Sequence, residues 1–277
     1  MNRAILIPTD FSENAWNALI YALNLYVNEP CSYYLLHAWS VSNPEDRTYI
    51  TAHYVDNLKA TALQQLTELK DKAEKANNNT KATFTTIFST DNLKNATEAA
   101  ITEHAIDVIV MGTKGTTGSK EFFFGSNTVK LLKMKLCPIL VVPDAYDFIE
   151  PKEIAFPTDF KRFYGEELLP IKQLAKLFNS KIRIAHITES RNLTKMQDYN
   201  LAMLKVYLED FPHRFHWIPD NSKKTQGIND FIEEFNINIL AMINYEHSFI
   251  EGIVKEPIVK KIGFHPIVPF FVIPCVT

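Results

Sequence analysis

The chain has 277 residues, of which 46% are hydrophobic, and 29 basic against 32 acidic side chains give a net charge of -3. This balance excludes a strongly basic nucleic-acid-binding protein, and the length predicts one large or two ordinary globular domains. No apolar run approaches the roughly 18 residues of a membrane-spanning helix, and the first residues lack a signal-peptide cleavage pattern. We therefore expect a cytoplasmic protein that contacts neither membrane nor nucleic acid.

The cysteines Cys31, Cys137 and Cys275 are odd in number and have no CxxC spacing. This pattern indicates neither a disulfide framework nor a zinc site. We therefore expect thiols packed in the core and no metal site.

In the first half of the chain, short apolar runs alternate with segments of helical spacing. A strand is expected at residues 4–7, and a helix follows behind the N-cap candidate Ser12. The later elements expected in this half are strands at 34–39, 84–88, 108–111 and 139–142 and helices at 51–77, 93–101 and 126–135. This alternation predicts an α/β fold with parallel strands, right-handed crossovers and helices on both faces of the sheet.

The second half of the chain repeats the first. Residues 5–11, ILIPTDF, return at 154–160 as IAFPTDF. CPILVVP, which ends at Pro143, corresponds to VPFFVIP, which ends at Pro274. In the second copy, strands are expected near Ile154, Ile182, Phe215, Ile239 and Phe270. Such a repeat predicts two copies of one structural unit.

The repeat divides the chain into two expected domains, residues 1–147 and 151–277. A polar, proline-containing stretch near 144–152 would serve as the linker. Each domain is expected to be a doubly wound, five-stranded parallel sheet flanked by helices.

A glycine-punctuated stretch, MGTKGTTGSKEFFFGSN, follows the fourth expected strand. It has the spacing G-x2-G-x9-G-S, at Gly112, Gly115, Gly125 and Ser126. Glycines let backbone amides approach a phosphate, and a helix that begins at Ser126 would present free N–H groups to an anion. The stretch therefore predicts a phosphate-binding loop. The alternative is that the glycines only permit a turn and that Ser126 only caps the helix.

The residues around this stretch carry positive charge. Between Gly112 and Lys135, Glu121 is accompanied by five lysines, at Lys114, Lys120, Lys130, Lys133 and Lys135. A positive segment within a net negative chain favours an anionic ligand. On charge alone, Lys114 is a candidate contact.

Three segments are expected at one edge of the first sheet, because ligands of open parallel sheets bind beyond the carboxyl ends of the strands. They are Pro8-Thr9-Asp10 after the first strand, the end of the second strand at Ala38, and the glycine stretch. Their convergence predicts a nucleotide-sized site. Asp10 could instead fix the turn, because the second copy keeps its counterpart, Asp159.

His37 and His186 recur at one strand position of the two copies. Such a recurrence favours packed histidines over catalytic ones. We therefore expect neither histidine to act as an acid or a base.

The glycine spacing, together with PTDF after the first strand and CPILVVP, resembles the ATP-binding motif and other signatures of the universal stress protein family. The resemblance covers the first copy throughout and the opening and closing strands of the second. It implies an adenine nucleotide alpha hydrolase-like fold that binds an adenine nucleotide such as ATP, with or without Mg2+. It also implies an intramolecular pseudo-dimer through strands 139–142 and 270–273, and it leaves further homo-oligomerisation open.

Carried over residue by residue, the resemblance implies that Thr9 and Asp10 lie near the adenosine and Ala38 beside the base. It implies that six residues line the ribose and phosphates: Met111, Gly112, Gly115, Gly125, Ser126 and Thr128. Asn127 would contribute mainly its backbone amide.

The second copy lacks the glycine pattern. The counterparts of Gly112, Gly115, Gly125 and Ser126 are Ile243, Glu246, Glu256 and Pro257. Between Ile243 and His265, three lysines are balanced by three glutamates. We therefore expect one nucleotide per chain, in the first domain.

The expected function is that of an ATP-binding stress-response or signalling module. No general base or arginine clamp is evident near the glycine stretch, which favours binding over efficient hydrolysis. Two alternatives remain open: an enzyme that hydrolyses ATP slowly or transfers a nucleotidyl group, and an interaction scaffold that binds no nucleotide.

Overall fold

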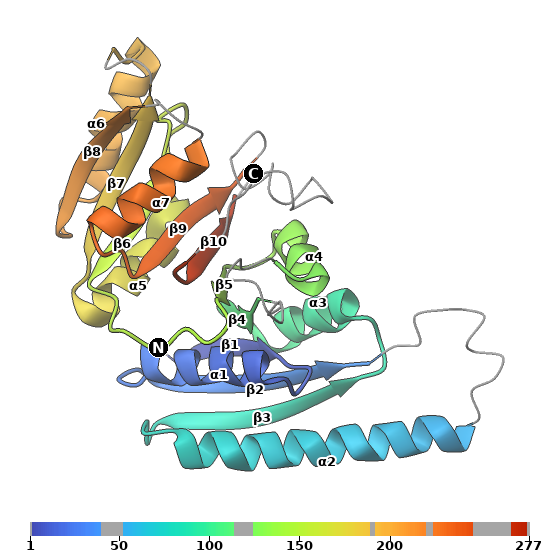
Figure 1. The fold of residues 1–277 in the computed structure, drawn as a ribbon. Helices are drawn as coiled ribbons and strands as arrows, with labels where there is room; N and C mark the ends of the chain where they lie inside the picture. The colour runs from blue at the N-terminus through green and yellow to red at the C-terminus, as the bar shows by residue number, and fades with distance from the viewer. Residues whose placement is uncertain are drawn as a thin grey trace. The chain divides into compact units, whose positions relative to one another are not determined.

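A computed structural model describes residues 2–39, 52–113, 124–188, 192–219, 224–245 and 267–275 (Figure 1). The chain forms two compact units, each of which is described by itself. Unit 1 comprises residues 1–113 and 125–145, and unit 2 comprises residues 114–124 and 146–277.

Unit 1 contains five parallel strands. They are β1 (Arg3–Pro8), β2 (Cys31–Ala38), β3 (Ala82–Ser89), β4 (Val108–Gly112) and β5 (Ile139–Val142). Their order is β3-β2-β1-β4-β5. The chain therefore builds the sheet outward from β1 in one direction and then returns to the other side of β1, which makes the carboxyl ends of β1 and β4 a topological switch point.

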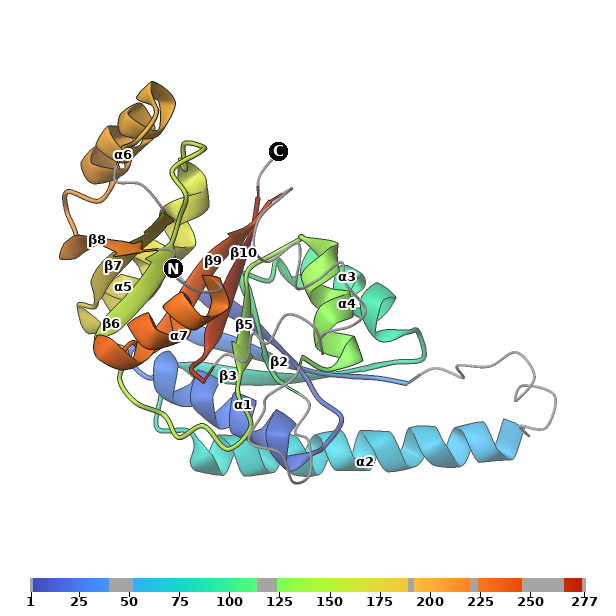
Figure 2. The ribbon, with the colours of Figure 1, turned by 45° about the horizontal axis from the view of Figure 1, so that its top comes forward.

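The helices of unit 1 cover both faces of its sheet. They are α1 (Glu13–Leu25), α2 (Ala52–Ala76), α3 (Leu93–His104) and α4 (Ser126–Met134). The contacting helices α1 and α2 lie on one face, and α3 and α4 lie together on the other. Figure 2 shows that α2 reaches past the strands it covers. Ser12 caps α1 by accepting a hydrogen bond from the Ala15 amide, as predicted.

Because helices cover both faces of the sheet, the strands of unit 1 form its buried core. Ile5, Leu6 and Ile7 are consecutive residues of β1, and all three are fully buried. Consecutive buried residues are typical of parallel strands with helices on both faces. The predicted α/β class is confirmed.

Unit 2 has the same strand order. Its strands are β6 (Glu153–Pro157), β7 (Lys181–Thr188), β8 (His213–Pro219), β9 (Ile239–Asn244) and β10 (Phe270–Pro274), ordered β8-β7-β6-β9-β10 and all parallel. Ile154 pairs with Ile239 in unit 2, just as Ile5 pairs with Val108 in unit 1. The second half of the chain therefore reproduces both the topology and the register of the first.

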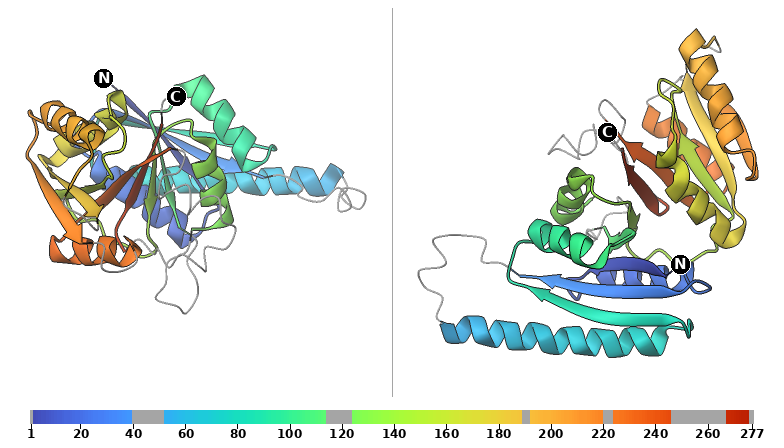
Figure 3. Two further views of the ribbon diagram at one scale, coloured as in Figure 1. Left: turned by 90° about the horizontal axis from the view of Figure 1, so that it is seen from above. Right: turned by 180° about the vertical axis from the view of Figure 1, so that it is seen from behind.

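The helices of unit 2 are the 3-10 turn η2 (Glu166–Leu168), α5 (Leu169–Phe178), α6 (Lys195–Tyr207) and α7 (Lys224–Glu234). Helices α6 and α7 lie on opposite faces of the sheet of unit 2 (Figure 3). Lys205 of α6 lies over the ring of Phe215, whereas His216 packs against Phe231 of α7. Successive residues of a strand point to opposite faces, which explains this arrangement.

The thiols of Cys31 and Cys137 are buried, as expected. Burial raises the pKa of Cys31 to about 11 and that of Cys137 to about 12, so both are protonated at neutral pH. Cys275 is only half-buried. Within the ranges that the structure describes, no helix is long and apolar enough to span a membrane.

Candidate functional site

The turn after β1 is held by its own polar side chains. The Thr9 hydroxyl accepts a hydrogen bond from the Phe11 amide at 3.0 Å, and Phe11 has a left-handed backbone with φ 64. Asp10 Oδ1 accepts from the amide of Ser12 at 3.1 Å and from its hydroxyl at 2.5 Å. Thr9 and Asp10 therefore fix the strand-to-helix turn, and Asp10 remains exposed at the edge of the sheet.

Unit 2 builds the same turn. The Thr158 hydroxyl accepts from the Phe160 amide at 3.1 Å, and Phe160 has φ 54. Asp159 Oδ1 accepts from the Lys161 amide at 2.9 Å. Because unit 2 lacks the glycine pattern, this turn forms without one. The predicted turn role of the aspartate is therefore present in both units, and contact of Asp10 with a ligand stays a prediction.

The two recurring histidines hold these turns in place. His37 Nδ1 lies 2.9 Å from the carbonyl oxygen of Thr9, and His186 Nδ1 lies 2.8 Å from that of Thr158. Each imidazole also lies 4.5 Å from the phenylalanine ring of its turn. The prediction of packed histidines is confirmed.

Gly112 is the point where two helices meet the end of β4. A Cβ on this residue would lie 2.5 Å from Oδ1 of Asn14, so the first turn of α1 leaves no room for a side chain. From the other side, the Thr128 hydroxyl of α4 donates a hydrogen bond to the Gly112 carbonyl at 3.3 Å. Gly112 therefore brings the start of α1 and the start of α4 to one strand end.

The N-terminus of α4 has no side-chain cap. Gly125 is the N-cap residue, with φ -62 and ψ 157, and it makes no side-chain capping bond. The alternative in which Ser126 caps the helix is therefore wrong, because Ser126 is the first helical residue. Ser126 and Asn127 are exposed, and the first turn contains no acidic residue. Side chains cap α1, α3 and α6, namely those of Ser12, Asn92 and Thr194, whereas α5 also begins without a side-chain cap. The first amides of α4 can therefore bind an anion.

Two further polar groups at this edge were missed by the sequence interpretation. Asn14 Oδ1 and Thr113 Oγ1 are buried, and neither has a hydrogen-bond partner in the part of the chain that the structure describes. Thr113 directly follows Gly112 and is 1% exposed. Buried polar groups without partners are rare, so these two atoms are candidates for contact with a ligand. The signals in the sequence were weak: an asparagine in the first turn of a helix and a threonine after a strand.

The remaining predicted residues differ in accessibility. Pro8 is buried at the end of β1, and Ala38 is half-buried at the end of β2. The Met111 side chain is buried in β4, so a ligand could reach only its backbone. Lys114 and Gly115 lie outside the described residues. Three lysines of the positive segment are exposed on α4 and just after it, namely Lys130, Lys133 and Lys135.

Across the described segments, no group of three or more histidine, cysteine, aspartate or glutamate residues could hold a metal ion.

In unit 2, an arginine occupies the edge where β6 and β10 end. Arg162 makes a bidentate ion pair with Glu167, with Nη2 at 2.7 and 2.9 Å from the two carboxylate oxygens. Its Nη1 lies 2.9 Å from Sγ of Cys275, and its guanidinium lies 5.0 Å from the centre of the Tyr245 ring. The counterpart of Gly112, Ile243, is 3% exposed and fills its position with a side chain.

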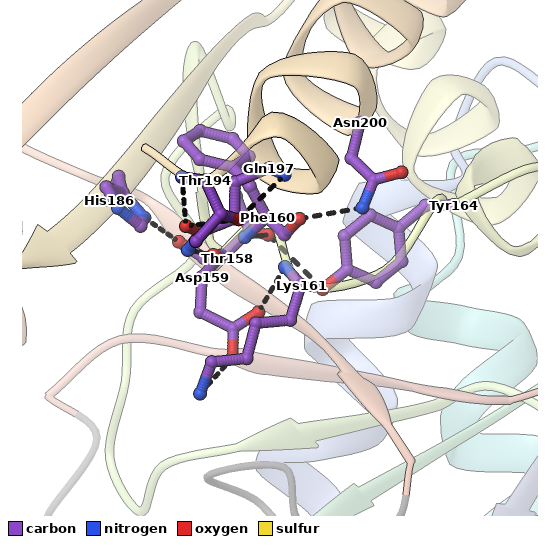
Figure 4. A network of polar contacts seen from close by, with 9 residues as sticks. All are labelled: Thr158, Asp159, Phe160, Lys161, Tyr164, His186, Thr194, Gln197 and Asn200. Atoms are coloured by element: carbon purple, nitrogen blue, oxygen red, sulfur yellow. Dashed lines mark hydrogen bonds and ion pairs between the residues drawn. The ribbon is translucent and has the colours of Figure 1, made fainter. Parts of the chain in front are cut away.

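The start of α6 covers the turn after β6 (Figure 4). Gln197 donates to the carbonyl oxygen of Asp159 at 2.9 Å, and Asn200 donates to that of Phe160 at 2.8 Å. The Thr158 hydroxyl donates to the Tyr164 hydroxyl at 3.2 Å. The carbonyl oxygens of Asp159 and Phe160 and the hydroxyl of Thr158 are therefore hydrogen-bonded to side chains of unit 2.

Comparisons with known proteins agree with this architecture. The model of the universal stress protein family matches residues 1–143. Universal stress protein YxiE of Bacillus subtilis (strain 168) is 24% identical over 151 residues, which cover 51% of this chain and 99% of that protein.

Two solved structures resemble both halves of the chain. A universal stress protein from Archaeoglobus fulgidus DSM 4304 has a TM-score of 0.72 at 20% identity, and the match covers 98% of this chain and 95% of that one. A putative universal stress protein from Pseudomonas aeruginosa UCBPP-PA14 has a TM-score of 0.60 at 11% identity, covering 98% and 92%. At these identities the structures support the fold, and the family model spans more than half of the sequence. This chain belongs to the universal stress protein family.

Proposed function

We propose that this protein is a cytoplasmic stress-response module that binds one ATP per chain, at the carboxyl ends of β1, β2 and β4. Residues 1–147 would form the nucleotide-binding domain, and residues 151–277 a second domain without a nucleotide site. The observation that carries the proposal is the uncapped N-terminus of α4, which follows the glycine stretch directly.

The electrostatics of α4 favour phosphates. The amino end of a helix carries a partial positive charge, and its first amides need acceptors from outside the helix. Here Gly125 provides no side-chain acceptor, and the first turn has no carboxylate. Lys130 lies exposed one turn further along the helix. A triphosphate would meet both needs, because it brings oxygen acceptors and negative charge.

The Gly112 end of the site suits the sugar and inner phosphate. Among the described residues, Asn14 Oδ1 and Thr113 Oγ1 have no hydrogen-bond partner there, and the exposed Asp10 carboxylate stands at the same edge. The resemblance to the family assigns the adenosine to Thr9, Asp10 and Ala38. The same edge of unit 2 carries the Arg162–Glu167 pair instead, which supports a single site per chain.

The test uses Gly125→Asp. The backbone of Gly125 lies in the ordinary extended region, so its conformation does not require glycine. Aspartate is a good N-cap, and the stability of the ligand-free protein should stay equal or rise by a few tenths of a kcal/mol. Its carboxylate would occupy the place of a phosphate and repel it. Thermal denaturation should show that ATP stabilises the natural protein, by about 2.7 kcal/mol at 100 times the Kd, and that the variant loses this gain.

Thr194→Asp is the matched control, because it also places aspartate at an N-cap, on α6 of unit 2. This variant should keep the full stabilisation by ATP. Equal stabilisation of the natural protein and Gly125→Asp would reject the site, and a stoichiometry of two would reject the single-site assignment. Turnover of ATP with Mg2+ would favour the enzyme alternative, and absence of saturable binding would favour the scaffold.

A further inference from the structure

Three neighbouring strands of unit 2 carry an ionic array on the face of the sheet that α7 covers. Arg183 of β7 makes a bidentate ion pair with Glu153 of β6, with Nε at 2.7 Å and Nη2 at 3.0 Å from the two carboxylate oxygens. Its third nitrogen, Nη1, lies 3.3 Å from Nε2 of His216 on β8. We refer to these three residues as the β6–β8 array. The guanidinium is therefore held between a carboxylate on one neighbouring strand and an imidazole on the other.

The end of α7 packs on this array through two phenylalanines. Phe231 lies in the last turn of α7, and Phe235 directly follows the helix. The centre of the His216 ring lies 5.1 Å from that of Phe231 and 4.5 Å from that of Phe235. The Arg183 guanidinium lies 4.5 Å from the centre of the Phe235 ring. His216 and Arg183 therefore fix the C-terminal end of α7 to the sheet.

The equivalent positions of unit 1 carry no such array. By the internal repeat and the strand pairing, the residues that replace it are apolar or aromatic, namely Ala4, Tyr34 and Ile87. On α3, which corresponds to α7, His104 takes the place of Phe235, and its ring stacks on Tyr34 at 4.4 Å. Ala105 and Asn236, which follow these two residues, both have positive φ, which supports the correspondence. The fold therefore forms without an ionic array at this place.

The bond between Arg183 and His216 requires a neutral imidazole. Arginine has N–H donors and no acceptor, so Nε2 of His216 accepts the bond and carries no proton. A proton on Nε2 would remove the bond and place two cations about 3.3 Å apart. The imidazole also packs against both phenylalanines. An imidazolium that moves away from Arg183 would therefore lose the contacts that hold the end of α7.

The charges around His216 also disfavour its protonation. Arg183 and Lys181 on β7 and Arg214 on β8 lie on the same face of the sheet as His216, since alternate residues of a strand share a face. Burial first, and then these positive charges, lower the pKa of His216 from 6.5, whereas Glu153 on β6 opposes them. The acidic residues in the C-terminal half of α7 are exposed to solvent, namely Asp230, Glu233 and Glu234.

We propose that the β6–β8 array is a pH-sensitive latch, in which protonation of His216 releases the C-terminal end of α7 from the sheet while the rest of unit 2 stays folded. The open state binds the proton more readily than the closed state, so a falling pH favours opening. Each unit by which the pKa of His216 differs between the two states changes the opening equilibrium about tenfold. The proposal does not depend on nucleotide binding.

The first experiment is hydrogen exchange of the full chain, followed by mass spectrometry from about pH 7.5 to about pH 5 and corrected for the intrinsic pH dependence of exchange. Peptides that cover residues 228–237 should lose protection several-fold toward acidic pH. Peptides from α5 should keep theirs, because the latch does not hold that helix. Protection of α7 that is independent of pH, or an equal loss in α5 and α7, would overturn the proposal.

The second experiment removes the titrating group. His216→Gln keeps an acceptor for Arg183 and cannot be protonated, so the end of α7 should stay protected at acidic pH. The matched control is His104→Gln, which makes the same substitution at the corresponding end of α3, and its α7 should respond to pH like that of the natural protein. A pH response of α7 that persists in His216→Gln would overturn the proposal.

A third experiment tests the role of the guanidinium. Glu153→Gln/Arg183→Gln removes both charges of the ion pair and leaves neither charge without its partner. The pKa of His216, measured by NMR titration, should rise toward 6.5, because the opposing effect of Glu153 is smaller than that of Arg183. The loss of protection in α7 at acidic pH should also become smaller. An unchanged pKa and an unchanged response of α7 would show that Arg183 is not part of a latch.

Discussion

The Thr128 hydroxyl donates a hydrogen bond to the Gly112 carbonyl oxygen across 3.3 Å, and this bond joins the first turn of α4 to the last residue of β4. Gly112 is the first glycine of the glycine stretch, and Thr128 directly follows that stretch. The bond therefore fixes the strand end relative to the first turn of α4.

Thr128→Val keeps the shape of this buried side chain and removes the bond. We expect the free energy of unfolding to fall by about 1 kcal/mol, the usual contribution of one hydrogen bond. ATP affinity should fall several-fold, because the amides of α4 are held less well. Urea denaturation and ATP titration measure the two effects. Thr128→Ser retains the hydroxyl and should behave like the natural protein, whereas unchanged affinity in the valine variant would show that this bond does not position the site.

Gly112→Ala should be costly because of Asn14. The new Cβ would lie 2.5 Å from Asn14 Oδ1, so the asparagine side chain must move. We expect a loss of about 1 to 2 kcal/mol in unfolding free energy from this overpacking. In an Asn14→Ala background the same substitution should be nearly neutral, which a double-mutant cycle would reveal as coupling. Additive effects in the cycle would contradict this packing.

Removing Arg162 from its ion pair with Glu167 should lower the free energy of unfolding more than replacing both residues. Glu167 is 7% exposed, so Arg162→Met leaves a nearly buried carboxylate without its partner. Because the Arg162 side chain is 29% exposed, we expect a loss of about 2 to 3 kcal/mol, below that of a fully buried pair. Arg162→Met/Glu167→Leu should lose less than Arg162→Met alone. Equilibrium denaturation would test this order, and the reverse order would contradict it.

His216 should contribute to acid sensitivity. Its pKa is lowered from 6.5 mainly by burial, and the positive charges of Arg183 and Arg214, and less strongly Lys181, act in the same direction, whereas Glu153 opposes them. The unfolded state therefore binds the proton more readily. The contribution of neutral His216 to folding stability is therefore fully present above about pH 6.5, and it is lost as the pH falls through the lowered pKa of the folded state.

His216→Gln should reduce the loss of stability that accompanies falling pH. Glutamine keeps a hydrogen-bond acceptor near Arg183, whose Nη1 lies 3.3 Å from His216 Nε2. Urea midpoints measured between about pH 5 and 8 would show the difference between the variant and the natural protein. As the pH falls, the free energy of unfolding of the natural protein should decrease relative to that of the variant. Parallel curves would exclude His216 as a source of the acid sensitivity.

Much of the fold could be predicted because hydrophobic spacing and capping are local properties. The apolar run at 4–7 gives β1, Ser12 caps α1, and the helix expected from Ser126 begins there. The strand at 34–39 begins earlier, at Cys31, because the tyrosines of β2 extend the apolar alternation. In α6, Leu204 and Leu208 are buried as their spacing indicates.

The site was less predictable, because its key contacts join distant parts of the chain. Asn14 matters because it packs against Gly112, and Thr128 matters because its hydroxyl bonds to the Gly112 carbonyl. Neither pair is visible in local spacing.

The sequence by itself determined the alternation of strands and helices, the internal repeat and the loss of the glycine pattern in the second copy, since these depend on the order of residues along the chain. Only the tertiary structure decided that Gly112 is packed between Asn14 and Thr128, that α4 begins without a side-chain cap, and that Arg162 occupies the corresponding edge of unit 2. These features depend on which side chains meet when the strands pair, because a hydrogen bond or a steric contact acts over a few ångströms in space, whatever the separation in sequence.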